Sequence, residues 1–213
     1  MSKTLAAAVL LALATPAFAH RLDEYLQATI LSVEKDRVQA SLRLIPGVAV
    51  APMVLWSIDT NGDGVISEGE QKAYAERVLG DLSLSIDGYP LRPRLVSVNF
   101  PGTEEMKAGI GEIQIEYTVD LPRSGGQRKL LLENHHLSRI STYLVNVLAA
   151  RDKTIQIATQ NRNENQSHYE LNYVQAGKLR DLKWLMSGAP LGIVGLLLLT
   201  RLAFAWRQRV TLN

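Results

Sequence analysis

The sequence predicts a mainly β (α+β) fold, in which an antiparallel β-sandwich carries one inserted helical excursion and is followed by a C-terminal transmembrane helix. Three observations favour this fold. Short segments in which apolar and polar residues alternate recur along most of the chain. One stretch, residues 71–82, repeats its apolar side chains at helical spacing instead. A final run from residue 184 is continuously apolar and long enough to cross a bilayer.

Composition supports a folded core and excludes several classes of protein. Of the 213 residues, 46% are hydrophobic and 21% are charged, which is enough apolar surface to bury a core. The formal net charge is +2, but several cations lie at the two chain ends. The middle of the chain is therefore mildly acidic, which argues against binding of nucleic acid. Cysteine is absent, which excludes disulfides and thiolate chemistry.

The N-terminal residues predict export. Lys3 precedes an apolar run over residues 5–14 that is too short to span a membrane, and the small residues ending at Ala19 suit a signal peptidase. We therefore expect residues 1–19 to be removed as a signal peptide. The mature chain would begin at His20.

The C-terminal hydrophobic run predicts a single membrane anchor. As a helix, residues 184–206 would be about 35 Å long, against about 30 Å for the hydrocarbon core of a bilayer. A cleaved signal peptide would place an exported domain, residues 20–177, and a linker, 178–183, in the periplasm of a bacterium. The tail 207–213 would stay in the cytoplasm. The expected location is thus the inner membrane, with a single span.

The expected span also carries a pair of small residues. Gly188 and Gly192 lie one helical turn apart, a spacing that lets two membrane helices approach closely. This spacing predicts a weak homodimer. The alternative, that the two residues reflect the general glycine content of membrane helices, stays open.

Several segments fit β-strands. Residues 25–33 and 37–45 alternate on either side of a polar turn, as a hairpin with one buried face does. The later expected strands span residues 84–86, 91–100, 110–119, 129–133, 142–148, 154–159 and 169–174. Between them, we expect a short helix over 53–58 and a longer one over 71–82, within a helical excursion near 48–82.

A run of oxygen-bearing residues lies between the two expected helices. It offers carboxylate, amide, hydroxyl and carbonyl oxygens without nitrogen or sulfur, which is the ligand set that Ca²⁺ prefers. Gly64 directly follows Asp63, and a glycine at this point permits the sharp turn that a metal-binding loop needs. The expected ligands are Asp59, Asn61, Asp63, Val65 through its carbonyl, Ser67 and Glu70.

Residues 59–70 resemble the EF-hand loop, which requires this order of ligands and a central glycine. The resemblance covers about residues 51–82 and implies a single inserted EF-hand helix–loop–helix that binds Ca²⁺. EF-hands usually pair through a residue that is Ile66 here, and residues 161–172 lack the glycine and glutamate of a second loop. We therefore expect Ile66 to pack against the sheet, and a dissociation constant of about 10⁻⁴ to 10⁻³ M.

A second metal hypothesis concerns histidine. Removal of the signal peptide would give His20 a free α-amine, which together with the imidazole can chelate copper or nickel. His135, His136 or His168 would complete such a site. Scattered histidines are also ordinary surface residues, so both interpretations stay open.

Residues 19–30, 141–146 and 169–174 resemble the exported N-terminal region of membrane proteins of the hydrogenase and urease accessory type, which are linked to nickel transport. Those relatives continue into several membrane spans, whereas a single span is expected here. The resemblance implies a bacterial envelope domain with a metal connection, and permease activity does not carry over.

The sequence contains no Ser-His-Asp order, nucleotide-binding glycine pattern or HExxH motif, so we expect neither an enzyme nor an organic cofactor. It predicts a calcium-binding, membrane-anchored envelope protein. The metal would stabilise an exported interaction domain that contacts another, unidentified envelope protein. The alternative is an accessory protein that delivers nickel or copper to a membrane transporter through His20.

Overall fold

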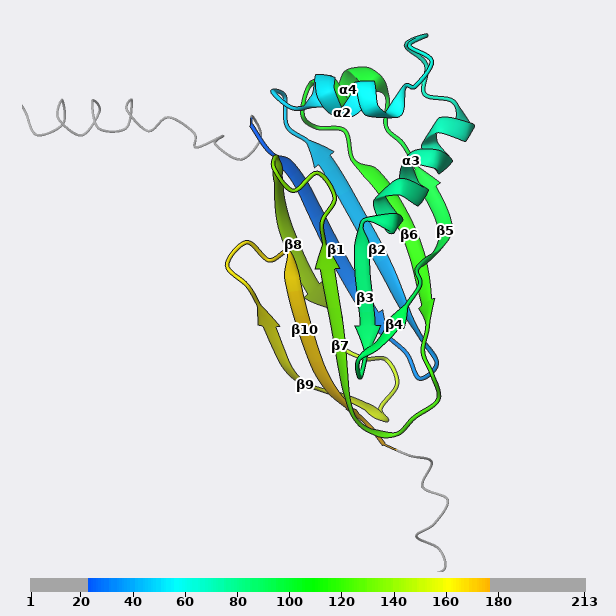
Figure 1. The fold of residues 1–213 in the computed structure, drawn as a ribbon, viewed down its shortest axis with the longest axis vertical. Coiled ribbons are helices and arrows are strands. Elements are labelled where there is room, and N and C mark those ends of the chain that lie inside the picture. Colours follow the sequence, from blue (N-terminus) through cyan, green and yellow to red (C-terminus); the bar gives the residue numbers. More distant parts are fainter. Residues whose placement is uncertain (1–22, 177–213) are drawn as a thin grey trace, which may run out of the picture. The chain divides into compact units, whose positions relative to one another are not determined.

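The computed structural model describes residues 23–176, which form two β-sheets and a small group of helices (Figure 1). The fold is mainly β, as the alternating sequence patterns predict. The expected signal peptide 1–19 and the expected span 184–206 lie outside the described residues. Within the described part of the chain, no helix is long and apolar enough to cross a membrane.

The first sheet contains five strands in the order β5-β6-β2-β1-β8. The strands are β1 (Tyr25–Val33), β2 (Arg37–Pro46), β5 (Arg94–Asn99), β6 (Ile113–Asp120) and β8 (Ser141–Val147). β1 and β2 form the expected antiparallel hairpin, in which Leu26 lies opposite Ile45. This hairpin is the centre of the sheet.

The second sheet also contains five strands, in the order β4-β3-β7-β10-β9. The strands are β3 (Leu82–Ile86), β4 (Tyr89–Leu91), β7 (Gly126–Asn134), β9 (Ile155–Arg162) and β10 (His168–Gln175). All neighbouring strands in it are antiparallel. The β3–β4 turn has positive φ at Asp87 and Gly88, the conformation that matches the twist of a tight hairpin.

The two sheets share one core. Every second side chain is buried along β1 in the first sheet and along β10 in the second. The buried apolar residues of both sheets belong to a single cluster. Burying one side chain the size of leucine stabilises a fold by about 1.5–3 kcal/mol, so this shared face is the main source of stability.

One strand pair corrects the expected antiparallel arrangement. β1 and β8 run parallel, with Tyr25 opposite Ser141, so the first sheet is mixed. A parallel pair needs a long connection, and here most of the domain lies between the two strands. Local alternation indicates which face of a strand is buried, but it does not indicate the direction of a neighbour so far along the chain.

Two boundaries near residue 100 differ from the expected ones. The strand expected over 91–100 is divided into β4 and β5, since Pro93 cannot donate a hydrogen bond to a ladder. The following loop contains a short helix, α4 (Thr103–Lys107), that alternation does not predict. Met106 is fully buried and anchors α4 in the core. Gly111 lies so close that a Cβ there would be 2.7 Å from the Met106 nitrogen.

The helical excursion consists of α2 (Ala51–Ile58) and α3 (Glu68–Gly80). α2 carries Pro52 in its first turn, where a missing N–H costs little. α3 begins earlier than expected because Ser67 caps it. The Ser67 side chain accepts from the Glu70 N–H, and the Glu70 side chain accepts from the Ser67 N–H. Figure 1 shows α2 and α4 at one end of the sandwich, with α3 leading from there to β3.

Candidate functional site

The loop between α2 and α3 begins where the sequence predicts and ends earlier than predicted. α2 ends at Ile58 and α3 begins at Glu68, so the expected ligands lie within the loop and in the first turn that follows it. Gly62 and Gly64 have φ values of +74° and +81°, in the left-handed region that disfavours a Cβ. These two glycines allow the chain to reverse within a few residues.

The first three expected ligands bond to the loop itself. Asp59 accepts from the N–H groups of Gly62 at 2.8 Å and of Gly64 at 2.9 Å. The Asp63 carboxylate accepts from the N–H two residues later at 2.8 Å, and from the side-chain amide of Asn61 at 2.9 Å. The polar oxygens of this part of the loop therefore stabilise the reversal.

Glu70 joins the two ends of the loop. Its Oε1 accepts from the backbone N–H of Thr60 at 2.8 Å and from the Thr60 hydroxyl at 3.0 Å. Its Oε2 accepts from the N–H of Ser67 at 3.0 Å and from the Ser67 hydroxyl at 2.8 Å. These bonds, with those from Ser67 foremost, lower the pKa of Glu70 to about 2, although burial opposes the shift. Glu70 is therefore ionised at neutral pH.

The next two residues of the loop differ in exposure. Val65 is 65% exposed, and because its side chain has no polar atom, its carbonyl is the group that could serve as a ligand. Ile66 is partly buried and packs against the apolar core, whereas its expected contact with the sheet stays a prediction. The loop is thus attached to the sandwich through Ile66 on one side and through α3 on the other.

The donor set of the loop fits a hard cation such as Ca²⁺, because it contains oxygen ligands alone. The side chains are arranged for hydrogen bonding, since the Glu70 carboxylate is bonded to Thr60 and Ser67. Across residues 23–176, no three His, Cys, Asp or Glu side chains gather closely enough to hold a metal ion. Ligation by Glu70 would require its carboxylate to exchange N–H donors for the ion.

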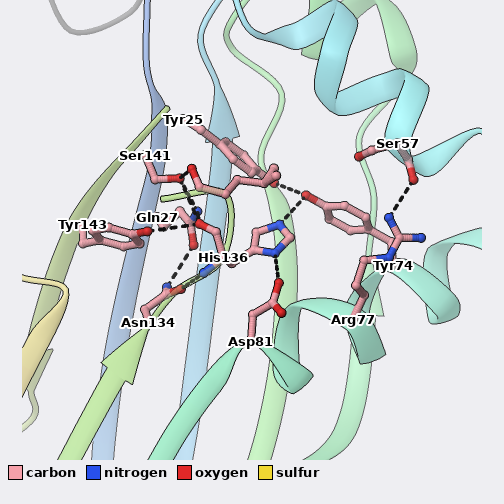
Figure 2. Close-up of polar contacts among 11 residues, drawn as sticks. Tyr25, Gln27, Ser57, Tyr74, Arg77, Asp81, Asn134, His136, Ser141 and Tyr143 are labelled. Carbon is pink, nitrogen blue, oxygen red and sulfur yellow. Dashed lines mark hydrogen bonds and ion pairs between the residues drawn. The ribbon is translucent and has the colours of Figure 1, made fainter. Parts of the chain in front are cut away.

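A buried polar network lies towards the C-terminal end of α3 (Figure 2). His136, between β7 and β8, is 2% exposed. Its Nδ1 is 2.7 Å from Asp81 Oδ2, and its Nε2 is 3.0 Å from the Tyr74 hydroxyl. The Tyr74 hydroxyl is 2.8 Å from that of Tyr25. Burial lowers the pKa of His136, against the opposing effect of Asp81, and raises the pKa of both tyrosines.

The network also joins the two sheets, as Figure 2 shows. Gln27 of β1 donates to the carbonyl of His136 at 2.8 Å and to the hydroxyl of Ser141 at 2.6 Å. The Gln27 carbonyl accepts from the side-chain amide of Asn134, in β7, at 2.9 Å. Asn134 in turn accepts from the N–H of His136 at 3.0 Å. Sequence reasoning missed this set of buried polar residues.

α3 links the loop to the network. Glu70 lies in its first turn, Tyr74 in its middle, and Asp81 at its C-cap. Arg77 donates to the carbonyl of Ser57, in the last turn of α2, at 3.0 Å. The helix is therefore tied to the loop at one end and to the core network at the other.

The two other histidines of residues 23–176, His135 and His168, have solvent-accessible side chains. Glu133 contacts both of them: its Oε1 is 2.9 Å from His168 Nδ1, and its Oε2 is 3.3 Å from His135 Nε2. His136 is directed into the core with both ring nitrogens bonded, so it is not a ligand for a surface metal. His20 lies outside the described residues.

Comparison of the chain with protein-family models, with curated proteins and with solved structures gave no match. The resemblances drawn from the sequence, to the EF-hand loop and to accessory membrane proteins, stay predictions.

Proposed function

We propose that the protein is a calcium-binding, membrane-anchored envelope protein in which one Ca²⁺ bound by residues 59–70 stabilises an exported interaction domain. One observation carries the proposal: α3 holds an expected ligand, Glu70, in its first turn and places Tyr74 in the core beside Tyr25 and His136. Binding at the loop would therefore restrain a helix that is already part of the sandwich.

Six residues would hold the ion: Asp59, Asn61, Asp63, Val65 through its carbonyl, Ser67 and Glu70. A bound Ca²⁺ supplies positive charge that several oxygens can share. The chain itself supplies the reversal at Gly64 and an ionised carboxylate at Glu70, whose pKa is lowered to about 2 by its hydrogen bonds. Both properties support the proposal.

The role of the ion is structural in this proposal. A calcium sensor opens a pair of helices and exposes a Met-rich groove. Here α2 has 8 residues, and Met53 is the single methionine of the two helices. A short helix fixed to the core by Val54 and Ile58 offers little surface for such a movement.

Isothermal titration calorimetry of the full chain in detergent tests the proposal. We expect Ca²⁺ binding with a dissociation constant of about 10⁻⁴ to 10⁻³ M, and its loss in Glu70→Gln. Glu76→Gln changes an exposed carboxylate of the same helix and should leave binding intact. At one hundred times the dissociation constant, calcium should add about 2.7 kcal/mol to the free energy of unfolding.

Two results would contradict it. One is a melting temperature that calcium does not change. The other is a large rise in the binding of a dye for exposed apolar surface, which would indicate a sensor that opens instead of a stabilised fold.

The second candidate function is delivery of nickel or copper to a membrane transporter. It is motivated by His135 and His168, whose imidazoles both contact the Glu133 carboxylate, although these three described side chains do not by themselves form a group that could hold a metal ion. His20, with its free α-amine, would provide the chelating end. This function requires copper or nickel binding that blocking of the α-amine abolishes, whereas Glu70→Gln would leave it unchanged.

Export and anchoring belong to the same proposal and rest on the sequence. Processing should give a protein that starts at His20 and needs detergent for extraction. Protease added outside the inner membrane should digest the domain 20–177. Weak association through Gly188 and Gly192 would be lost when both are changed to Leu, with Leu197→Ala as the control.

A further inference from the structure

A groove of about 850 Å³ lies between α3 and β5, and residues 59–70 do not line it. Its apolar lining includes Leu91, Leu95 and Val98, which are half-buried and pack against the core. The groove therefore offers an apolar floor that the described chain covers only in part.

Cations line the same groove. The lining includes three cations, Lys72 on α3, Arg92 before β5 and Arg94 in β5, and one acidic residue, Glu76. Arg94 forms an ion pair with Asp120 at 2.9 Å, and Lys72 is 3.9 Å from Glu76. Arg92 is exposed and has no hydrogen bond or ion pair with any other residue in the range 23–176. The groove consequently has an excess of positive charge.

One wall of the groove is an open strand edge. β5 pairs with β6 and has no second neighbour within the described part of the sheet. An edge strand presents unpaired N–H and C=O groups that can accept another strand. The ladder to β6 shifts register between Leu95 and Ser97, and Val96, between them, is 64% exposed. α3 contacts β5 and forms the opposite wall.

We infer that this groove binds an extended peptide segment of a partner protein, which adds to β5 as a strand and places an acidic side chain against Arg92. Main-chain hydrogen bonds to the strand edge would supply affinity, and the apolar floor and the cations would select alternate side chains. The charge argues against a second copy of this chain, because pairing of β5 with itself would bring Arg92 and Arg94 towards like charges.

This inference goes beyond the calcium proposal, because the groove and residues 59–70 are separate. It shares with the proposed function only the assumption that this domain contacts other proteins. Glu70→Gln should therefore leave peptide binding unchanged, so that failure of the calcium proposal and failure of the peptide proposal are distinguishable.

Selection from a library of linear peptides of about ten residues, displayed on phage, tests the inference with the full chain immobilised in detergent. We expect enrichment of sequences in which apolar residues alternate with Asp or Glu. A fluorescent peptide of the enriched sequence should then slow amide hydrogen exchange across residues 94–99. Absence of enrichment, enrichment of basic sequences, or unchanged exchange in β5 would overturn the proposal.

Three variants locate the site. Arg92→Glu should lower the affinity for the fluorescent peptide by about tenfold. A peptide with Lys in place of its acidic residue should bind that variant with restored affinity. Gly80 lines the groove, and a Cβ there meets nothing within 4 Å, so Gly80→Leu should block the groove without disturbing the helix. Arg151→Glu, at an exposed position outside the groove, is the control. Equal losses in Arg92→Glu and Arg151→Glu would overturn the proposal.

Discussion

At the scale of single residues, His136 depends on the groups around it. Both ring nitrogens have partners, Asp81 and Tyr74, and the ring itself is 2% exposed. Burial disfavours the imidazolium, and Arg77 adds to this effect, while Asp81 favours the charged form. The balance keeps the pKa of His136 below its ordinary value.

This pKa predicts the pH dependence of stability. Because the pKa is lower in the folded state, the unfolded chain binds more protons as the pH falls through the ordinary histidine range, about 6.5. The free energy of unfolding should therefore fall as the solution is acidified from neutrality through that range. His136→Phe should cost about 1–3 kcal/mol at neutral pH and remove much of this slope. Urea unfolding at a series of pH values measures both effects.

His135→Gln provides the control for this prediction. The His135 side chain is 63% exposed, so its removal should leave the slope of the wild-type protein in place. If both variants retain the wild-type slope, another group is responsible for the pH dependence.

The sequence shows part of this residue-scale chemistry. The order of the expected oxygen ligands in residues 59–70 can be read from the sequence because such a loop is local. The buried network is harder to recognise, since its members come from β1, α3 and the β7–β8 connection. One signal was present: Gln27 occupies the same phase of the β1 alternation as Tyr25 and Leu31, both of which are buried.

At the scale of elements, the local sequence pattern predicts the strands and the helix cap, but it does not predict the short helix α4. The hairpin β1–β2 follows from alternation. The start of α3 at Glu68 could be inferred from the spacing of Ser67 and Glu70, the capping-box arrangement. α4 has 5 residues and depends on burial of Met106, a tertiary contact that no local pattern encodes.

Ser67→Ala tests the contribution of this cap. It removes the hydroxyl that accepts from the Glu70 N–H and donates to Glu70 Oε2, so the free energy of unfolding should fall by about 1 kcal/mol. The same change should raise the pKa of Glu70, which NMR titration of that carboxyl measures. Ser83→Ala, at an exposed position of β3, should have little effect on either quantity. Equal stabilities of the two variants would contradict the capping role.

At the scale of the whole molecule, the sheets are joined by polar contacts as well as by apolar packing. Asn134 Nδ2 of the second sheet donates a hydrogen bond of 2.9 Å to Gln27 Oε1 of the first. Strand directions across the molecule were beyond sequence reasoning. The alternation in β1 and β8 indicates which face of each strand is buried. The pattern is the same for parallel and antiparallel neighbours, so it does not distinguish them.

Gln27→Leu tests the importance of the contact between the sheets. The change keeps the size of the side chain but leaves the side-chain N–H donor of Asn134 without its buried partner, while the His136 carbonyl keeps the hydroxyls of Ser141 and Tyr143. We expect a loss of about 1–3 kcal/mol in urea unfolding. Gln39→Leu, at an exposed position of β2, is the matched control and should be nearly neutral. A Gln27→Leu protein as stable as wild type would show that the contact between the sheets contributes little.

The parallel pairing of β1 with β8 has a kinetic consequence. Gln27 and Ser141, which bond across this pair, are 114 residues apart in the chain. Closing so long a loop lowers the conformational entropy of the chain before stabilising contacts form, so a topology of this kind folds slowly. A chain that crosses a membrane from its N-terminus onwards would expose β1 first and β8 much later. The first sheet of such a chain could close only after most of the domain had crossed the membrane, so the chain would stay unfolded while it crossed.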